Sequence, residues 1–183
     1  MISFKQYMLQ ESSVTKHLKD IAKMQHLKKK GFAYDGPAEF ILRHGKQYQS
    51  AELTPEEMDI LENVVGLKCL YKAKQCFYNA QSIGLAGTIG YVEGYADSVG
   101  IPMDHAWNTI NGKVIDMTWK MNNNDEPVLG VIPGGWEYFG VELPHELINS
   151  VWSTGRSNSI INDWEHDFPL LEEPYGDNWE INY

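Results

Sequence analysis

The chain contains little cysteine and no long apolar run. Two cysteines, Cys69 and Cys76, stand among 183 residues, too few for the disulfide framework of a small secreted domain. No apolar stretch reaches the roughly 18 to 20 residues that a membrane-spanning helix needs. The opening residues, Met1 to Tyr7, lack the charged-then-apolar layout of a secretory signal. We therefore expect a soluble cytoplasmic protein without membrane contact, in which both cysteines are thiols.

Positive charge is scarce in the second half of the chain. The net charge of -10 disfavours binding to nucleic acid backbones and anionic membranes. Seven of the 15 basic residues lie in the first 30 positions, whereas from Met121 onward there is only Arg156 against twelve acidic residues. The ordinary explanation is a basic N-terminal helix that docks on the acidic half or faces solvent. The alternative is a weak contact of this helix with an acidic protein or nucleic acid.

Length and composition predict one domain over residues 1–183. With 43% hydrophobic and 12% aromatic residues, the chain can fill a core of its own. We divide it into an N-terminal helical part (1–68), a central part that carries the chemistry (69–120), and a C-terminal part (121–183) with further strands and an acidic, aromatic tail. The histidines have no metal-ligand spacing, so we expect neither a metal nor an organic cofactor.

Helix signals dominate the chain before residue 85. Amphipathic spacing predicts one or two helices between Ser3 and Lys30. A second helix should begin with Thr54 as N-cap, Pro55 at the first helical position and Glu57 closing a capping box. A third should begin at or near Cys76, where exposed amide groups and the helix dipole favour a thiolate. The predicted buried stripe of the second helix is Met58, Ile60, Leu61, Val64 and Val65.

Period-two alternation predicts an antiparallel sheet after residue 89. Asn111 and Gly112 form a two-residue hairpin turn between two of its strands. In simple register, facing residues have numbers that sum to 223, as those of the turn residues do, which places Asp116 diagonally across from His105. With the helices, this predicts an α+β fold. The expected strands are residues 91–95, 105–110, 113–119, 128–132 and 138–143, followed by a short helix at 144–152.

Three residues within 41 positions have the chemistry of a catalytic triad: Cys76, His105 and Asp116. A thiol attacks an acyl carbon as the thiolate, an imidazole can take its proton, and a carboxylate can hold the imidazole in the right tautomer. Asp116 lies inside an otherwise apolar strand. A buried carboxylate there needs a specific partner, and His105 is the natural one.

These segments resemble the transglutaminase-like branch of the papain-like thiol enzymes. In that superfamily a cysteine begins a helix, a strand with a Gly-Tyr pair follows, a His-Ala-Trp strand carries the base, and an Asp-x-Thr strand carries the orienting acid. The corresponding segments here are Cys76, Val92 to Tyr95, His105 to Trp107, and Asp116 to Thr118, within about residues 70 to 120.

The resemblance implies a papain-like core, with the catalytic cysteine at the N-terminus of a helix packed on an antiparallel sheet. It also implies a cysteine-dependent acyl-transfer enzyme: an amide hydrolase, protease, deamidase or transglutaminase-like transferase acting on an amide-bearing protein or small molecule. The opening residues look like those of small bacteriophage proteins, which suggests the cytoplasm of a bacterium or of a phage-infected one.

Further residues are candidates for the same site. The amide of Cys76 is the expected oxyanion donor, and the side chains of Gln75 and Asn79 are alternatives for a second donor. These two stand where the superfamily commonly has glycine and aspartate. Glu93 points either to the cleft or to solvent. Trp107 is expected in the core or in the cleft wall.

Two other functions compete with acyl transfer. One is the hydrolysis of a glycosidic or nucleotide-derived substrate by Glu93, His105 and Asp116, with Cys76 incidental. The other is a non-catalytic binding or inhibitory protein of phage type, in which Cys76 has no special reactivity. Cys69 is expected to be a small buried structural residue.

Overall fold

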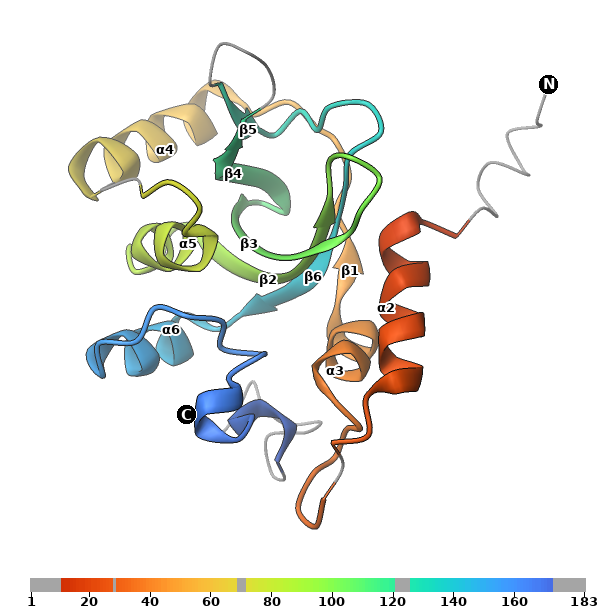
Figure 1. Ribbon diagram of the computed structural model, residues 1–183. Helices are drawn as coiled ribbons and strands as arrows, with labels where there is room; N and C mark the ends of the chain where they lie inside the picture. The colour runs from red at the N-terminus through yellow and green to blue at the C-terminus, as the bar shows by residue number, and fades with distance from the viewer. Residues whose placement is uncertain (1–10, 28, 69–71, 121–125, 173–183) are drawn as a thin grey trace, which may run out of the picture.

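The protein has an α+β fold, as predicted (Figure 1). The computed structural model describes residues 11–27, 29–68, 72–120 and 126–172. In this part of the chain there are five α-helices and one six-stranded antiparallel sheet, and none of the helices is long and apolar enough to cross a membrane. The elements are α2 (Ser13–Met24), α3 (Pro37–His44), β1 (Lys46–Gln47), α4 (Pro55–Lys68), α5 (Cys76–Gly84), β2 (Gly90–Asp97), β3 (Met103–Ile110), β4 (Lys113–Lys120), β5 (Pro127–Leu129), β6 (Glu137–Leu143), α6 (His145–Ser153), and the 3-10 turns η1 (Trp164–His166) and η2 (Pro169–Leu171).

The sheet has the strand order β1-β6-β2-β3-β4-β5 and curves strongly (Figure 1). The predicted hairpin between β3 and β4 is confirmed, since Asn108 pairs with Ile115 and Ile110 with Lys113. Asn111 and Gly112 both have positive φ angles, 51° and 76°, as a two-residue turn of this hand requires. This register brings the strands that carry His105 and Asp116 side by side.

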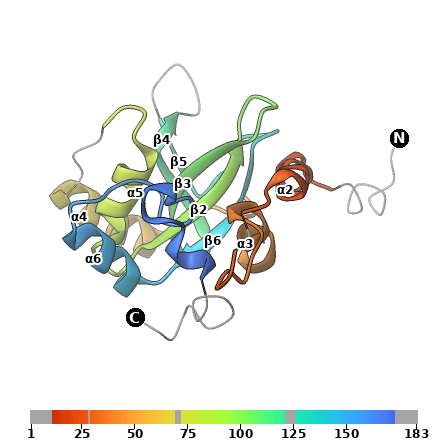
Figure 2. The ribbon, with the colours of Figure 1, turned by 60° about the horizontal axis from the view of Figure 1, so that its bottom comes forward.

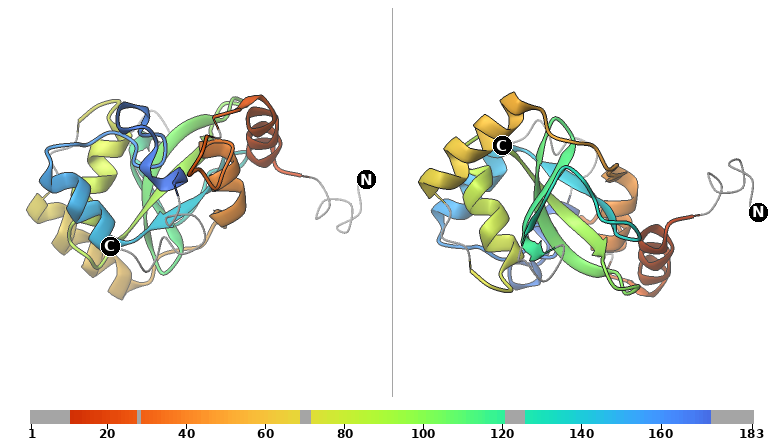
Figure 3. Two further views of the ribbon diagram at one scale, coloured as in Figure 1. Left: turned by 90° about the horizontal axis from the view of Figure 1, so that it is seen from below. Right: turned by 90° about the horizontal axis from the view of Figure 1, so that it is seen from above.

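The helices cover the sheet in two groups. Figures 1 and 2 show α4, α5 and α6 together on one side and α2 with α3 on the other, and both views of Figure 3 keep these groups apart. α5 packs against β2, β3 and β4. It therefore lies directly on the strands that carry the predicted base and acid.

The capping box of α4 is confirmed. The Thr54 amide donates to Glu57 Oε2 at 2.8 Å, and the Glu57 amide donates to Thr54 Oγ1 at 3.2 Å. The predicted buried stripe is correct for Leu61, which is 4% exposed, but wrong for Ile60, which is 39% exposed. A strict helical stripe overestimates burial at the outer edge of a helix that contacts its neighbour on a narrow face.

The basic N-terminal segment contacts acidic residues from later in the chain. The predicted helix between residues 3 and 30 is α2 in the described part, and positions 1–10 lie outside that part. The amide of Val14 donates to Glu137 at 3.1 Å, and Lys29 forms an ion pair with Asp167. At these points the segment docks on the acidic half of the chain. In the acidic, aromatic tail, Leu170 and Leu171 are buried in the core.

Candidate functional site

Cys76 is the first residue of α5, as predicted, and it is half-buried. The preceding residue, Gln75, makes no side-chain capping bond. The first intrahelical bond runs from the amide of Asn79 to the carbonyl of Gln75 at 2.9 Å. The amides of the first helical turn therefore lie beside the thiol without intrahelical acceptors, and they give this end of the helix a partial positive charge.

His105 and Asp116 form a buried hydrogen-bonded pair. Nε2 of His105 lies 2.7 Å from Oδ2 of Asp116, and the two side chains are 2% and 1% exposed. Since a carboxylate only accepts, Nε2 carries the hydrogen of this bond. The other ring nitrogen, Nδ1, remains available to exchange a proton with a second group.

Asp116 is held on both of its oxygens. The amides of Thr118 and Trp119 donate to Oδ1 at 2.8 and 3.1 Å, and the hydroxyl of Tyr138 donates to Oδ2 at 3.0 Å. These bonds compensate for the removal of the carboxylate from water. Tyr138 belongs to β6, which β2 and β3 separate from β4 in the sheet, and it reaches Asp116 because the sheet is curved. The sequence offered no signal for this contact.

Aromatic rings surround the imidazole. The ring of Trp119 stacks on His105 with centroids 4.3 Å apart and planes 22° apart, and the ring of Trp107 lies nearly parallel at 6.1 Å. Trp107 is 1% exposed, so it is a core residue rather than a residue that a substrate can touch directly. Burial, with Asp116 nearby, raises the pKa of the Tyr138 hydroxyl. Tyr138 therefore remains a donor to Asp116.

The pKa of His105 reflects the groups on both sides of the ring. Burial alone would lower this pKa, but the charge of Asp116 and its hydrogen bond raise it, and the Cys76 thiol raises it further, to about 9. Cys76 and Asp116 thus both act on His105. The structure brings together the three residues that the sequence placed in a triad.

Asn79 links the helix of the thiol to the strand of the acid. Its side chain accepts from the amide of Lys72 at 2.9 Å and donates to the carbonyl of Lys72 at 2.8 Å. It also donates to Thr118 Oγ1 at 3.1 Å. Both hydrogens of this buried amide are used inside the protein, which leaves none for an oxyanion. Gln75, by contrast, is exposed next to the thiol.

Glu93 has neither of its two expected orientations, toward the cleft or toward solvent. It is 1% exposed and accepts four hydrogen bonds within the core. The donors are the hydroxyls of Tyr91 and Ser159 and the amides of Ile160 and Ile161, at 2.5, 2.7, 2.7 and 2.9 Å respectively. Strand alternation could not reveal this role, because the segment that covers Glu93 lies more than 60 residues away in the sequence. Glu93 holds that segment to the sheet.

Within the described residues, no group of three or more His, Cys, Asp and Glu side chains could hold a metal ion. Cys69 lies outside the described residues. Comparison of the chain with known protein families, with curated proteins and with solved structures gave no match.

Proposed function

We propose that the protein is a cysteine-dependent acyl-transfer enzyme with a papain-like, transglutaminase-like core. Cys76 is the nucleophile, His105 the general base and acid, and Asp116 the residue that orients His105. The observation that carries the proposal is the buried hydrogen bond of 2.7 Å between His105 and Asp116, together with the effect of the thiol that begins α5 on the pKa of His105.

The protonation state of His105 supports an ion pair between the imidazolium of His105 and the thiolate of Cys76 before substrate binds. Burial works against a charged imidazole, yet Asp116 and the Cys76 thiol raise the pKa of His105 to about 9. At neutral pH the imidazole then holds a proton, and an imidazolium beside a thiol at a helix N-terminus favours the thiolate. Asp116 fixes the ring through Nε2, so the proton is exchanged at Nδ1.

The reaction follows from these positions. The Cys76 thiolate adds to the acyl carbon of an amide or ester, and the carbonyl oxygen becomes an oxyanion. The free amides of the first turn of α5, that of Cys76 above all, are its donors, and the exposed side chain of Gln75 is the candidate second donor. His105 gives its proton to the leaving amine, and a thioester forms on Cys76. Water or a second amine then attacks the thioester, while His105 takes the proton of the attacking group.

The competing functions have less support. Hydrolysis by Glu93, His105 and Asp116 needs Glu93 in a cleft, but four hydrogen bonds occupy Glu93 inside the core. A purely binding protein gains nothing from a buried His105–Asp116 pair with three further donors to the carboxylate. Replacement of a buried ion pair by apolar residues is often neutral or stabilising, so such a pair contributes little to stability alone.

Trapping of the acyl-enzyme tests the proposal. The full chain is mixed with 4-nitrophenyl acetate, and the acetylated residue is identified by peptide mass spectrometry. We expect rapid acetylation of Cys76 and no comparable acetylation of Cys69. The variant His105→Gln should acetylate on the order of 100-fold more slowly, whereas Cys69→Ala should behave like the wild type. Equal acetylation of the two thiols, or a rate unchanged in His105→Gln, would overturn the proposal.

A further inference from the structure

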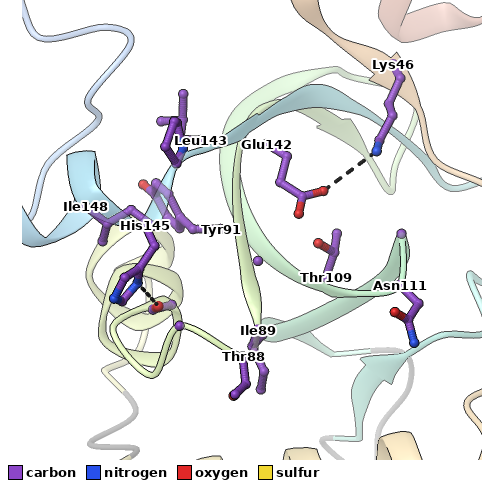
Figure 4. Close-up of a pocket in the computed structure, with 15 residues that line it drawn as sticks. Lys46, Thr88, Ile89, Tyr91, Thr109, Asn111, Glu142, Leu143, His145 and Ile148 are labelled. Atoms are coloured by element: carbon purple, nitrogen blue, oxygen red, sulfur yellow. Dashed lines mark hydrogen bonds and ion pairs between the residues drawn. The ribbon is translucent and has the colours of Figure 1, made fainter. Parts of the chain in front are cut away.

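A polar pocket lies at the other end of α5 from Cys76. Its volume is about 740 Å³, and it is bounded by the C-terminal end of α5, the start of β2, the hairpin turn between β3 and β4, and the end of β6 (Figure 4). At 1.5 Å per residue, the nine-residue helix separates the pocket from the thiol by about 12 Å. The pocket is thus distinct from the candidate active site.

Thr109 contributes a buried hydroxyl without a partner. The residue is 2% exposed, and its Oγ1 has no hydrogen-bond partner among the described residues. Figure 4 shows the side chain projecting toward the carboxylate of Glu142. A buried hydroxyl that makes no hydrogen bond is costly, and such groups in native proteins call for an explanation. A ligand that forms a hydrogen bond with the Thr109 hydroxyl would explain why this group has no partner.

Glycine at position 90 opens the floor of the pocket. A Cβ atom there would lie 2.4 Å from Glu142 Oε1 and 2.5 Å from Thr109 Oγ1, so both oxygens face the same small space. The other oxygen of Glu142, Oε2, lies 3.7 Å from Nζ of Lys46 in a loose ion pair. Because the side chain of Glu142 is 42% exposed, it can rotate and admit a ligand to both oxygens.

Several side chains on the pocket wall present hydrogen-bond acceptors. The side-chain amide of Asn111 donates to Glu57 at 2.8 Å, which leaves the Asn111 amide oxygen as an acceptor on the pocket side (Figure 4). His145 offers no free nitrogen, because Nδ1 donates to the carbonyl of Gly84 at 3.1 Å and Nε2 lies 2.8 Å from Nδ2 of Asn149. The acceptors include Glu142 Oε1, Thr109 Oγ1 and Asn111 Oδ1. They suit a ligand that brings donors and positive charge.

From these groups we propose that the pocket binds the primary ammonium group of a small amine. The ammonium donates to Glu142 and Thr109, and the net charge of -10 favours the approach of a cation. Lys46 acts as an internal competitor, since its own ammonium already lies near Glu142. A free diamine and a lysine side chain of a peptide present the same group, so both are candidate sources. The proposal does not depend on the acyl-transfer function.

Binding is measured by NMR titration of the isotope-labelled full chain at constant ionic strength. The probes are 1,4-diaminobutane, a blocked lysine amide, acetate and methyl glucoside. We expect saturable shifts at the amides of Gly87, Gly90 and Gly112 with either amine and none with acetate or the glucoside. Stronger binding of the diamine would identify a free amine as the source, and stronger binding of the lysine amide would identify a peptide.

Matched variants separate the proposal from anion or sugar binding. Glu142→Gln should weaken amine binding at least tenfold and Thr109→Val about threefold, while Glu146→Gln, an exposed neighbour outside the pocket, should change nothing. Lys46→Met should strengthen amine binding because it removes the competing ammonium. If the pocket instead bound an anion through Lys46, the same variant would lose that binding. The proposal is overturned if neither amine saturates, if acetate or glucoside binds more tightly, or if Glu142→Gln binds the amines unchanged. The amide spectra of the variants confirm that each one is folded.

Discussion

Asn79 in α5 donates a hydrogen bond of 3.1 Å to the hydroxyl oxygen of Thr118 in β4. Thr118 in turn donates its amide to Asp116 at 2.8 Å. These two bonds connect the helix that begins with the thiol to the carboxylate that holds His105. Asn79 is therefore a positioning residue for the proposed triad and does not act on the substrate.

Asn79→Ala should disturb the triad and the fold together. It removes three hydrogen bonds and leaves the backbone groups of Lys72 without this partner, which should lower the free energy of unfolding by about 1 to 3 kcal/mol. Alkylation of Cys76 by iodoacetamide at pH 6 should also slow several-fold. The control is Asn63→Ala, which removes one exposed bond to Asp59 and should affect neither quantity. A normal alkylation rate in a clearly destabilised Asn79→Ala variant would limit Asn79 to a structural role.

Asp116→Asn should lower the pKa of His105. The charge of Asp116 and its hydrogen bond are the main causes that raise this pKa to about 9 against the effect of burial. Without the negative charge the midpoint should fall by more than one unit, which NMR titration of the imidazole carbon-bound proton can follow. Asp163→Asn, which changes a carboxylate paired with Arg156 and His166, should leave the midpoint of His105 unchanged. An unchanged midpoint in Asp116→Asn would mean that the charge of Asp116 does not act on His105, and it would contradict the proposed roles.

Gly94 should not tolerate a side chain. It pairs with His105 on one side and with Gly140 on the other, and a Cβ there would lie 2.2 Å from the carbonyl oxygen of Phe139. Because this atom belongs to the backbone of β6, Gly94→Ala must displace a strand and should cost about 2 kcal/mol or more. Gly66→Ala is the control, since nothing lies within 4 Å of its Cβ position and the helical site should gain about 0.5 to 1 kcal/mol. Urea denaturation of both variants measures these changes.

Glu93 should make stability depend on pH in a definite direction. Burial raises the pKa of Glu93 to about 7, although its four hydrogen bonds lower it. Because the folded pKa lies above that of the unfolded chain, the stabilisation is complete below about pH 4.5 and is lost as the pH rises through 7. The advantage of the wild type over Glu93→Gln in unfolding free energy should therefore be larger at pH 5 than at pH 8, by roughly 2 to 3 kcal/mol.

The control for this experiment is Glu146→Gln, which changes an exposed carboxylate and should show no such difference. An advantage of the wild type over Glu93→Gln that grows with rising pH would contradict the account. It would mean that the four donors outweigh the cost of burial.

The sequence predicted those parts of the fold and the site that depend on local signals. The capping box of α4, the turn at Asn111 and Gly112, and the start of α5 at Cys76 each involve residues close in sequence. The hairpin register followed from the turn, and it led to the His105–Asp116 contact. Such features depend on backbone geometry that a few residues determine.

The remaining features depend on contacts between distant segments. Tyr138 reaches Asp116 only because the sheet is curved, and no periodicity in β6 indicates this. From the sequence alone, alternation along its strand points Glu93 either to the cleft or to solvent. In the structure, the segment from Ser159 to Ile161 covers Glu93. The pocket with Thr109 also requires several elements from distant parts of the chain to meet. No window of the sequence contains the residues that form these contacts.

The most direct test of the Cys76–His105 pair is the pH dependence of iodoacetamide alkylation at each cysteine, followed by mass spectrometry in the wild type and in His105→Ala. We expect that Cys76 reacts rapidly below pH 7, that Cys69 does not, and that His105→Ala removes the difference. Equal, slow labelling of both cysteines in the wild type would contradict a thiolate sustained by His105.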